Sequence, residues 1–164
     1  MVIELGHPKS GDAPATPEEF RGAAVNRTYS GLRGMVCDSV GPIRHEVSIP
    51  FHDSQVRGIA LLIQTGWDRR WGTESYWEPG PFLGQQVIFR MVRAGVRLVG
   101  VDFPIIEGSP DTLLITTCKI AIVQNLRDLA SLPRVGFHFS AIPLEALEAS
   151  SVGFCHVHAI AEII

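Results

Sequence analysis

The sequence is poor in cysteine and has no long apolar run, and each shortage excludes a class of protein. Its three cysteines, Cys37, Cys118 and Cys155, form no Cys-x-x-Cys pair and cannot all be joined in disulfides. This usage is typical of a reducing cytoplasm rather than of a secreted, disulfide-bonded scaffold. No apolar run approaches the roughly 20 residues of a membrane-spanning helix, and residues 1–7 are too acidic for a signal peptide. We therefore predict a cytoplasmic protein that does not bind membranes.

The chain also has little excess of charge of either sign. Its net charge is −3, and its basic residues are scattered along the sequence. The pair Arg69-Arg70 is too short to make a nucleic-acid patch. Hydrophobic residues make up 46% of the 164 residues, which is enough for a sizeable core. We expect a single domain spanning residues 1–164 and no nucleic-acid partner.

Hydrophobic patterning predicts several strands and one clear helix. Residues 59–63 form a short apolar run that is typical of a buried strand. Residues 82–94 carry apolar side chains at helical spacing and end before Gly95, and residues 96–103 are rich in β-branched residues. Further strands are predicted at 120–123, 136–144 and 156–164, and a helical segment at 113–115. Many strands with few helices favour a mixed α/β fold.

The N-terminal part of the chain carries most of the residues that break regular structure. Prolines and glycines recur through residues 8–33. Within this stretch, Thr16 can cap a short helix, Pro17 suits its first position and Glu19 can close a capping box. We expect residues 1–33 to form an irregular N-terminal segment.

Four strings of this sequence follow one another in the order and spacing of a known family. Residues 62–73 resemble the string LL-x-TGWD-x-x-WGT, residues 95–104 resemble GVRLVGID-x-P, residues 122–126 resemble I-V-E-N-L, and residues 136–144 resemble GF-x-F-x-ALPL. Together they resemble the cyclase family, which includes kynurenine formamidase-like, metal-dependent hydrolases. The resemblance implies a swivelling β/β/α fold and a homodimer or larger homo-oligomer.

The resemblance also implies a chemistry. Members of the family typically hydrolyse amide or formamide bonds with a divalent metal, often zinc or manganese. Its ligands come from a motif His-x-Gly-Thr-His-x-Asp-x-Pro-x-His in the N-terminal third. Such a metal polarises a carbonyl group and lowers the pKa of a bound water to about 7.

The residues that this chemistry needs are altered in this chain. No His-x-Gly-Thr-His string occurs, and the remnant ligand candidate near the N-terminus is His7, although one imidazole does not make a metal site. The family's acid–base His and Glu fall on Thr112 and Gln124, neither of which titrates near neutral pH. We therefore predict no cofactor and interpret Thr112 and Gln124 as residues that orient a carbonyl group. Zinc or manganese is the alternative if a metal site persists.

Aromatic side chains are densest between residues 67 and 77. We predict that Trp67, Trp71 and Tyr76, together with Phe103, bind a small, aromatic or apolar substrate. The alternative is that these side chains cap the end of the sheet or pack against a second subunit. In contrast, Asp68 and Asp102 are expected to accept hydrogen bonds within turns and loops.

Two classes of function follow from these features. The first is an enzyme of hydrolase descent that performs a metal-independent cyclisation, isomerisation or dehydration in secondary metabolism, by holding the substrate in a reactive geometry. The second is a non-catalytic binding or partner subunit that keeps the sheet and the oligomer interface. A third reading retains metal-dependent hydrolysis of the arylformamidase type.

Overall fold

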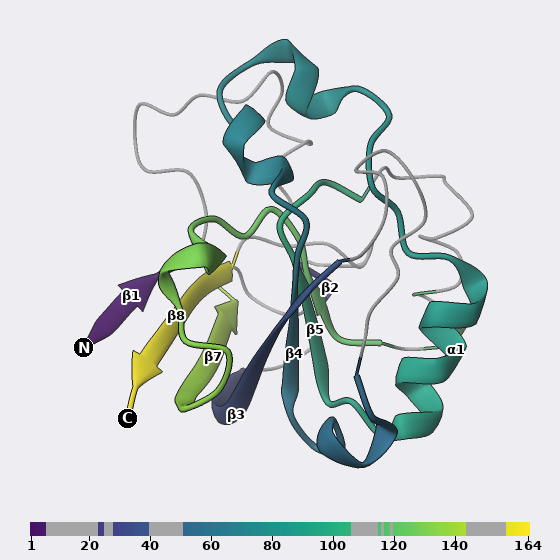
Figure 1. The fold of residues 1–164 in the computed structure, drawn as a ribbon, viewed down its shortest axis with the longest axis vertical. Coiled ribbons are helices and arrows are strands. Elements are labelled where there is room, and N and C mark those ends of the chain that lie inside the picture. Colours follow the sequence, from purple (N-terminus) through teal and green to yellow (C-terminus); the bar gives the residue numbers. More distant parts are fainter. Residues whose placement is uncertain are drawn as a thin grey trace.

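The protein folds as one mixed sheet with a helix packed against it. The computed structural model describes residues 1–5, 23–24, 28–39, 51–105, 115, 117–118, 120–143 and 157–164. The strands are β1 (Val2–Glu4), β2 (Ala23–Ala24), β3 (Tyr29–Asp38), β4 (Ala60–Gln64), β5 (Leu98–Val101), β6 (Ile122–Val123), β7 (Phe137–Pro143) and β8 (Val157–Ile163). The sheet has eight strands in the order β1-β8-β7-β3-β4-β5-β6-β2 (Figure 1).

The centre of the sheet is parallel. Strands β3, β4, β5 and β6 run in the same direction, so their carboxyl ends lie at one edge, which we call the carboxyl edge. Helix α1 (Gln85–Ala94) joins β4 to β5 and packs beside them (Figure 1). The helix ends at Gly95, whose positive φ of 81° lets its N–H donate to the carbonyls of Met91 and Val92. The described residues also contain short 3-10 turns: η2 (Asp53–Gln55), η3 (Trp67–Arg70), η4 (Glu74–Trp77) and η5 (Leu129–Ser131).

The other half of the sheet is antiparallel. Strand β7 pairs with β3, β8 pairs with β7, and β1 pairs with β8, each in antiparallel register. The first and last strands of the chain are therefore neighbours, as Val2 lies opposite Glu162 (Figure 1). At the far end of the sheet, β2 pairs antiparallel with β6.

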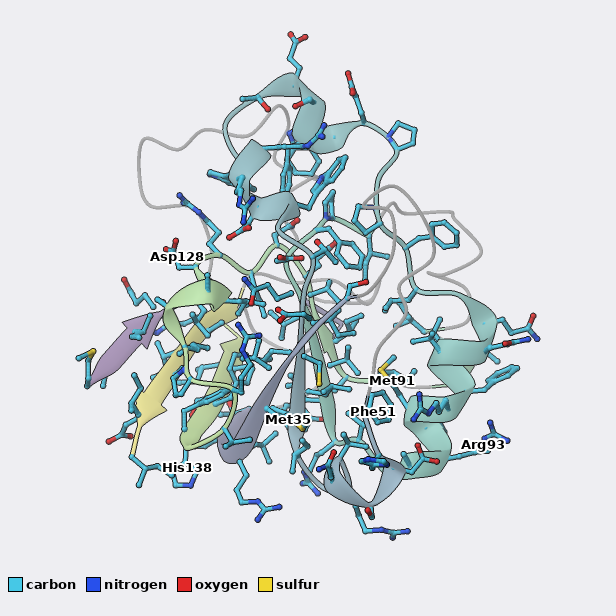
Figure 2. The ribbon with its side chains drawn as sticks, in the orientation of Figure 1. Met35, Phe51, Met91, Arg93, Asp128 and His138 are labelled. Carbon is cyan, nitrogen blue, oxygen red and sulfur yellow. The ribbon has the colours of Figure 1, made fainter. Side chains whose placement is uncertain are left out.

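Two hydrophobic cores lie on opposite faces of the sheet. Alternation along β4 directs Leu61 and Ile63 toward the face that α1 covers, whereas Ala60 and Leu62 face the second core. On the first face, Met91 points from α1 toward the sheet while Arg93 points to solvent (Figure 2). The second core is enclosed by β7, β8, β1 and the segment around η5. Among the described residues, no helix is long and apolar enough to cross a bilayer.

Most of the expected elements are present with shorter bounds. The strands predicted at 59–63, 96–103, 120–123, 136–144 and 156–164 correspond to β4, β5, β6, β7 and β8, and the helix predicted from residue 82 begins at Gln85. Of the predicted helical segment at 113–115, residue 115 is helical, as are 117 and 118, and 113–114 lie outside the described residues. The mixed α/β class is confirmed.

The expectation of an irregular stretch over residues 1–33 needs correction. Strands β1 and β2 and the first half of β3 lie within it. The glycines of β3 had indicated chain breaks, but Gly31, at φ 66°, accompanies a register shift between β3 and β7. Gly34 makes room for a neighbour, because a Cβ atom there would lie 2.0 Å from the Phe137 ring. The short helix expected at Thr16 lies outside the described residues.

Candidate functional site

Polar side chains gather where the parallel strands end. The residues that follow β4 begin with Thr65 and Gly66, those after β5 are Asp102 and Phe103, and those after β6 include Gln124. In open α/β sheets, ligands bind outside the carboxyl ends of the parallel strands. Turns η3 and η4 lie over this edge, at the top of the view in Figure 1. The carboxyl edge is therefore the candidate site.

Asp102 ties the loop after β4 to the end of β5. Its Oδ2 accepts hydrogen bonds from the backbone N–H groups of Thr65 at 2.9 Å and Gly66 at 2.8 Å, and its Oδ1 accepts one from the Thr65 hydroxyl at 2.6 Å. The carboxyl group is fully buried. Burial raises the pKa of Asp102 to about 6, although the hydrogen bonds from Thr65 and Gly66 act in the opposite direction. The expectation that Asp102 accepts loop hydrogen bonds is confirmed.

Asp68 has the same kind of role. Its Oδ2 accepts a hydrogen bond from the backbone N–H of Asp128 at 3.0 Å. Because Asp68 lies in η3 and Asp128 precedes η5, this bond joins the loop after β4 to the segment after β6. The prediction for Asp68 is therefore confirmed as well.

The aromatic residues above the carboxyl edge form one packed cluster. The indole N–H of Trp67 donates to the Tyr76 carbonyl at 2.9 Å. The Tyr76 ring stands edge-to-face against Trp71, with centroids 5.0 Å apart, and against Trp77 at 4.9 Å. Gly80 packs so closely on Trp67 that an added Cβ would lie 2.7 Å from the indole ring. The cluster thereby fixes the position of the Tyr76 hydroxyl.

Burial separates the four residues predicted to bind substrate. Trp67, Tyr76 and Phe103 are 0%, 1% and 1% exposed and belong to the core beneath the loops, whereas Trp71 is half-buried. Their packing fits the alternative in which aromatic side chains cap the end of the sheet. Contact with a substrate stays a prediction, and Trp71 is the member of the set with accessible surface.

Gln124 occupies the position at which the family resemblance places a glutamate. It is buried, and its Oε1 accepts a hydrogen bond from the backbone N–H of Ile105. A neutral amide thus bridges the chain after β6 to the chain after β5. Thr112 and His7, the other two site residues expected from the sequence, lie outside the described residues.

Asn125 is a site residue that the sequence reasoning missed. It is 1% exposed and has a positive φ of 59°, a conformation that asparagine tolerates better than most residues. Its Oδ1 accepts a hydrogen bond from the Tyr76 hydroxyl at 2.7 Å. Within the described part of the chain, its buried Nδ2 has no hydrogen-bond partner. A buried donor left unpaired costs about 1–3 kcal/mol, so this amide needs an explanation.

A comparison of Asn125 with its neighbour shows why it was missed. The string at 122–126 drew attention to Gln124, because the family resemblance gives that position a titrating role. The available signal was the asparagine itself, since Asn in the turn or loop after a strand is a frequent choice for positive φ.

The metal motif has a counterpart in the sequence, but at another place than expected. The motif ends in Pro-x-His, and the one such string in this chain is Pro50-Phe51-His52. In that register, Pro42 stands at the first His position, Glu46 at the second and Ser48 at the Asp. This string follows β3 in the sequence, whereas His7, the expected remnant, lies outside the described residues and stays a prediction.

The donor set of this counterpart does not fit a catalytic metal. Glu46 and His52 supply one carboxylate and one imidazole, whereas catalytic zinc has three protein ligands. His52 is exposed and precedes η2, and its backbone N–H donates to the side chain of Gln55, the last residue of η2. The described ranges contain no group of three or more His, Cys, Asp and Glu side chains that would hold a metal ion.

Part of the chain matches a known protein family. The family model named Cyclase matches residues 43–108, about two fifths of the chain. A protein of uncharacterised function from Methanocaldococcus jannaschii is 28% identical over 169 residues, with 90% of this chain and 89% of that protein covered.

Two solved structures show the same fold at low identity. The predicted metal-dependent hydrolase from Bacillus stearothermophilus has a TM-score of 0.65 at 12% identity and covers 98% of this chain and 97% of its own. Isatin hydrolase A from Ralstonia solanacearum has a TM-score of 0.62 at 15% identity and covers 96% of this chain, which spans 66% of that hydrolase. The fold is therefore that of the cyclase-type, metal-dependent hydrolases. The chain resembles the cyclase family over residues 43–108.

Proposed function

We propose that this protein is a metal-independent enzyme that holds a small carbonyl compound at the carboxyl edge and promotes its cyclisation, isomerisation or dehydration in secondary metabolism. The observation that carries the proposal is Gln124. At the position of the family's glutamate stands an amide that cannot take up or release a proton near neutral pH, and its oxygen is engaged by the Ile105 N–H. Such a residue orients groups and does not act as a general base.

The catalytic power of such a site comes from geometry. Holding a substrate in a reactive conformer can supply several kcal/mol of barrier lowering without proton transfer by the protein. In this proposal Gln124 and Thr112 orient a carbonyl group, and the exposed part of Trp71 contacts an aromatic or apolar body. The names of the isatin hydrolases among the structural neighbours are in line with a small bicyclic carbonyl compound. We further propose that the protein acts as a homodimer or larger homo-oligomer.

Metal analysis tests the proposal. Protein purified from cells supplied with zinc and manganese should contain far less than one ion per chain by plasma mass spectrometry. Turnover of a panel of small aromatic carbonyl compounds should be unchanged by a chelator. The variant Gln124→Glu should not gain hydrolytic activity, because the proposed mechanism uses no metal-activated water. A bound ion near one per chain, together with chelator-sensitive cleavage of a formamide or lactam, would overturn it.

A second candidate is retained metal-dependent amide hydrolysis. The match of Pro50-Phe51-His52 to the end of the motif, with Glu46 upstream, favours it. Its distinguishing test is the pair of variants Glu46→Ala and His52→Ala, which should abolish both metal content and cleavage if this candidate holds. A non-catalytic binding subunit would instead show saturable binding without turnover in the same panel.

A further inference from the structure

We propose that the Asn125 side-chain amide is the donor that binds a neutral carbonyl oxygen, such as that of a lactam or ketone, at the carboxyl edge. This proposal deepens the proposed function by naming the ligand class, but it concerns binding and holds whether or not the protein turns the ligand over. It starts from the buried Nδ2 of Asn125, which has no hydrogen-bond partner among the described residues. The two N–H groups on that nitrogen require an acceptor.

The orientation of the amide is set by Tyr76. The Tyr76 hydroxyl donates to Oδ1 of Asn125 at 2.7 Å, so the oxygen of the amide is occupied and the nitrogen is the free end. The Tyr76 ring cannot shift easily, because Trp71 and Trp77 stand edge-to-face against it. The donor is therefore held in one direction before any ligand arrives, which is the condition for efficient recognition.

The backbone of Asn125 is fixed as well. Its N–H donates to the Phe103 carbonyl at 3.2 Å, and the N–H of the next residue, Leu126, donates to the Val101 carbonyl at 3.0 Å. These bonds hold the segment after β6 against the last residue of β5 and the chain that follows it. Asn125 thus sits between two strand ends at the carboxyl edge, where the positive φ of 59° turns its side chain out of the strand alternation.

The surrounding charges distinguish a neutral acceptor from an anion. Burial is the largest cause that raises the pKa of Tyr76. The carboxylates of Asp102 and Asp68 raise this pKa further, and Arg127 lowers it. Two carboxylates therefore act on the group that holds Asn125, and a ligand carboxylate would be repelled by them. A ketone, lactam or amide oxygen satisfies the donor without that repulsion.

The test compares three small probes of similar shape by calorimetric titration. They are oxindole, which is a neutral lactam, indane, which lacks the carbonyl group, and 2-aminophenylacetate, which is the ring-opened carboxylate. Oxindole should bind about tenfold or more tightly than indane, as expected for one buried hydrogen bond, and the carboxylate should bind most weakly. Equal binding of oxindole and indane by the native protein would overturn the proposal.

Variants separate Asn125 from a general apolar site. Asn125→Asp keeps the side-chain size and an acceptor for the Tyr76 hydroxyl but replaces the donor, so it should abolish the preference for oxindole over indane. Tyr76→Phe releases the amide and should weaken oxindole binding several-fold without affecting indane. If both variants keep the native preference, the proposal is wrong.

One measurement uses the native protein alone, so its result cannot be caused by a variant that fails to fold. The carbonyl stretch of oxindole bound to native protein should move to lower frequency than in an apolar solvent, because a donor faces the oxygen. An unshifted stretch would contradict the proposal even if oxindole binds. Absence of turnover in all of these experiments would count against the proposed function alone.

Discussion

At the scale of single residues, the carboxyl edge combines a charged group that is satisfied with an amide that is not. Asp102 is fully buried, yet its oxygens accept three hydrogen bonds from Thr65 and Gly66. Desolvation still outweighs these bonds, since the pKa of Asp102 is raised to about 6. Asp102 therefore holds the loop in place at some cost in stability when it is ionised.

This cost predicts a pH dependence of stability. The pKa of Asp102 is about 6 in the folded protein, against an ordinary value of 3.8 for aspartate, so the native state binds the proton more tightly than the unfolded state. Its contribution to folding is complete below pH of about 4 and is lost as the pH rises through about 6. Asp102→Asn keeps an acceptor for the two backbone N–H groups but removes this titration.

Urea unfolding at a series of pH values checks this prediction. Between pH 8 and pH 4, the free energy of unfolding of the native protein should rise relative to that of Asp102→Asn, by up to about 3 kcal/mol. Because the other carboxyl groups titrate in both proteins, they cancel in the difference. Parallel stability profiles would show that Asp102 keeps its ordinary pKa in the folded state.

At the scale of secondary structure, β3 joins the parallel half of the sheet to the antiparallel half. It pairs in parallel with β4 and antiparallel with β7. The close approach of β7 depends on Gly34, because the Phe137 ring occupies the space of a side chain there. A single missing side chain therefore allows the two halves to meet.

Gly34→Ala tests this contact. The added methyl group would overlap the Phe137 ring, so we expect a loss of about 1–3 kcal/mol in the free energy of unfolding. In a Phe137→Leu background, which vacates part of the ring volume, the same change should cost less. The double-mutant cycle, measured by chemical denaturation, should give a coupling of at least about 0.5 kcal/mol. Strict additivity of the two changes would contradict the packing argument.

The elements differ in how well the sequence predicts them. Strand β4 could be predicted from its apolar run, and helix α1 from the helical spacing of its apolar residues, because both patterns follow from burial. Strand β3 could not, since Gly31 and Gly34 indicate chain breaks unless the partner ring of Phe137 is known. In the site, chemical type predicted the loop-binding role of Asp102, whereas the role of Asn125 depends on Tyr76, a residue 49 positions away.

At the scale of the whole molecule, the sheet keeps two cores apart and leaves the carboxyl edge to the loops. The order of the strands was not predictable from the sequence, because pairing of β1 with β8 joins opposite ends of the chain. Local sequence patterns do not predict contacts between residues that are far apart in the chain. Strand β8 is central to this arrangement, as it pairs with both β1 and β7 and buries Ala159 and Ala161 in the second core.

Two truncations test the importance of β8. A chain lacking residues 157–164 should lose cooperative unfolding, since it leaves β1 without a partner, exposes one edge of β7 and opens the second core. A chain lacking residues 1–4 removes only the outermost strand and should remain folded with a lower melting temperature. Circular dichroism melts and limited proteolysis distinguish the two. A cooperative melt of the chain without β8 would show that the second core forms without it.

The adjacency of β1 and β8 has a consequence for the order of events on the ribosome. Strand β1 precedes the other described strands, whereas its partner β8 follows them, so β1 is synthesised well before β8. Until β8 has emerged, β1 and the outer edge of β7 lack this partner and remain available to other chains. The pairing of β1 with β8 and of β8 with β7 is therefore completed only after the rest of the described sheet has been synthesised.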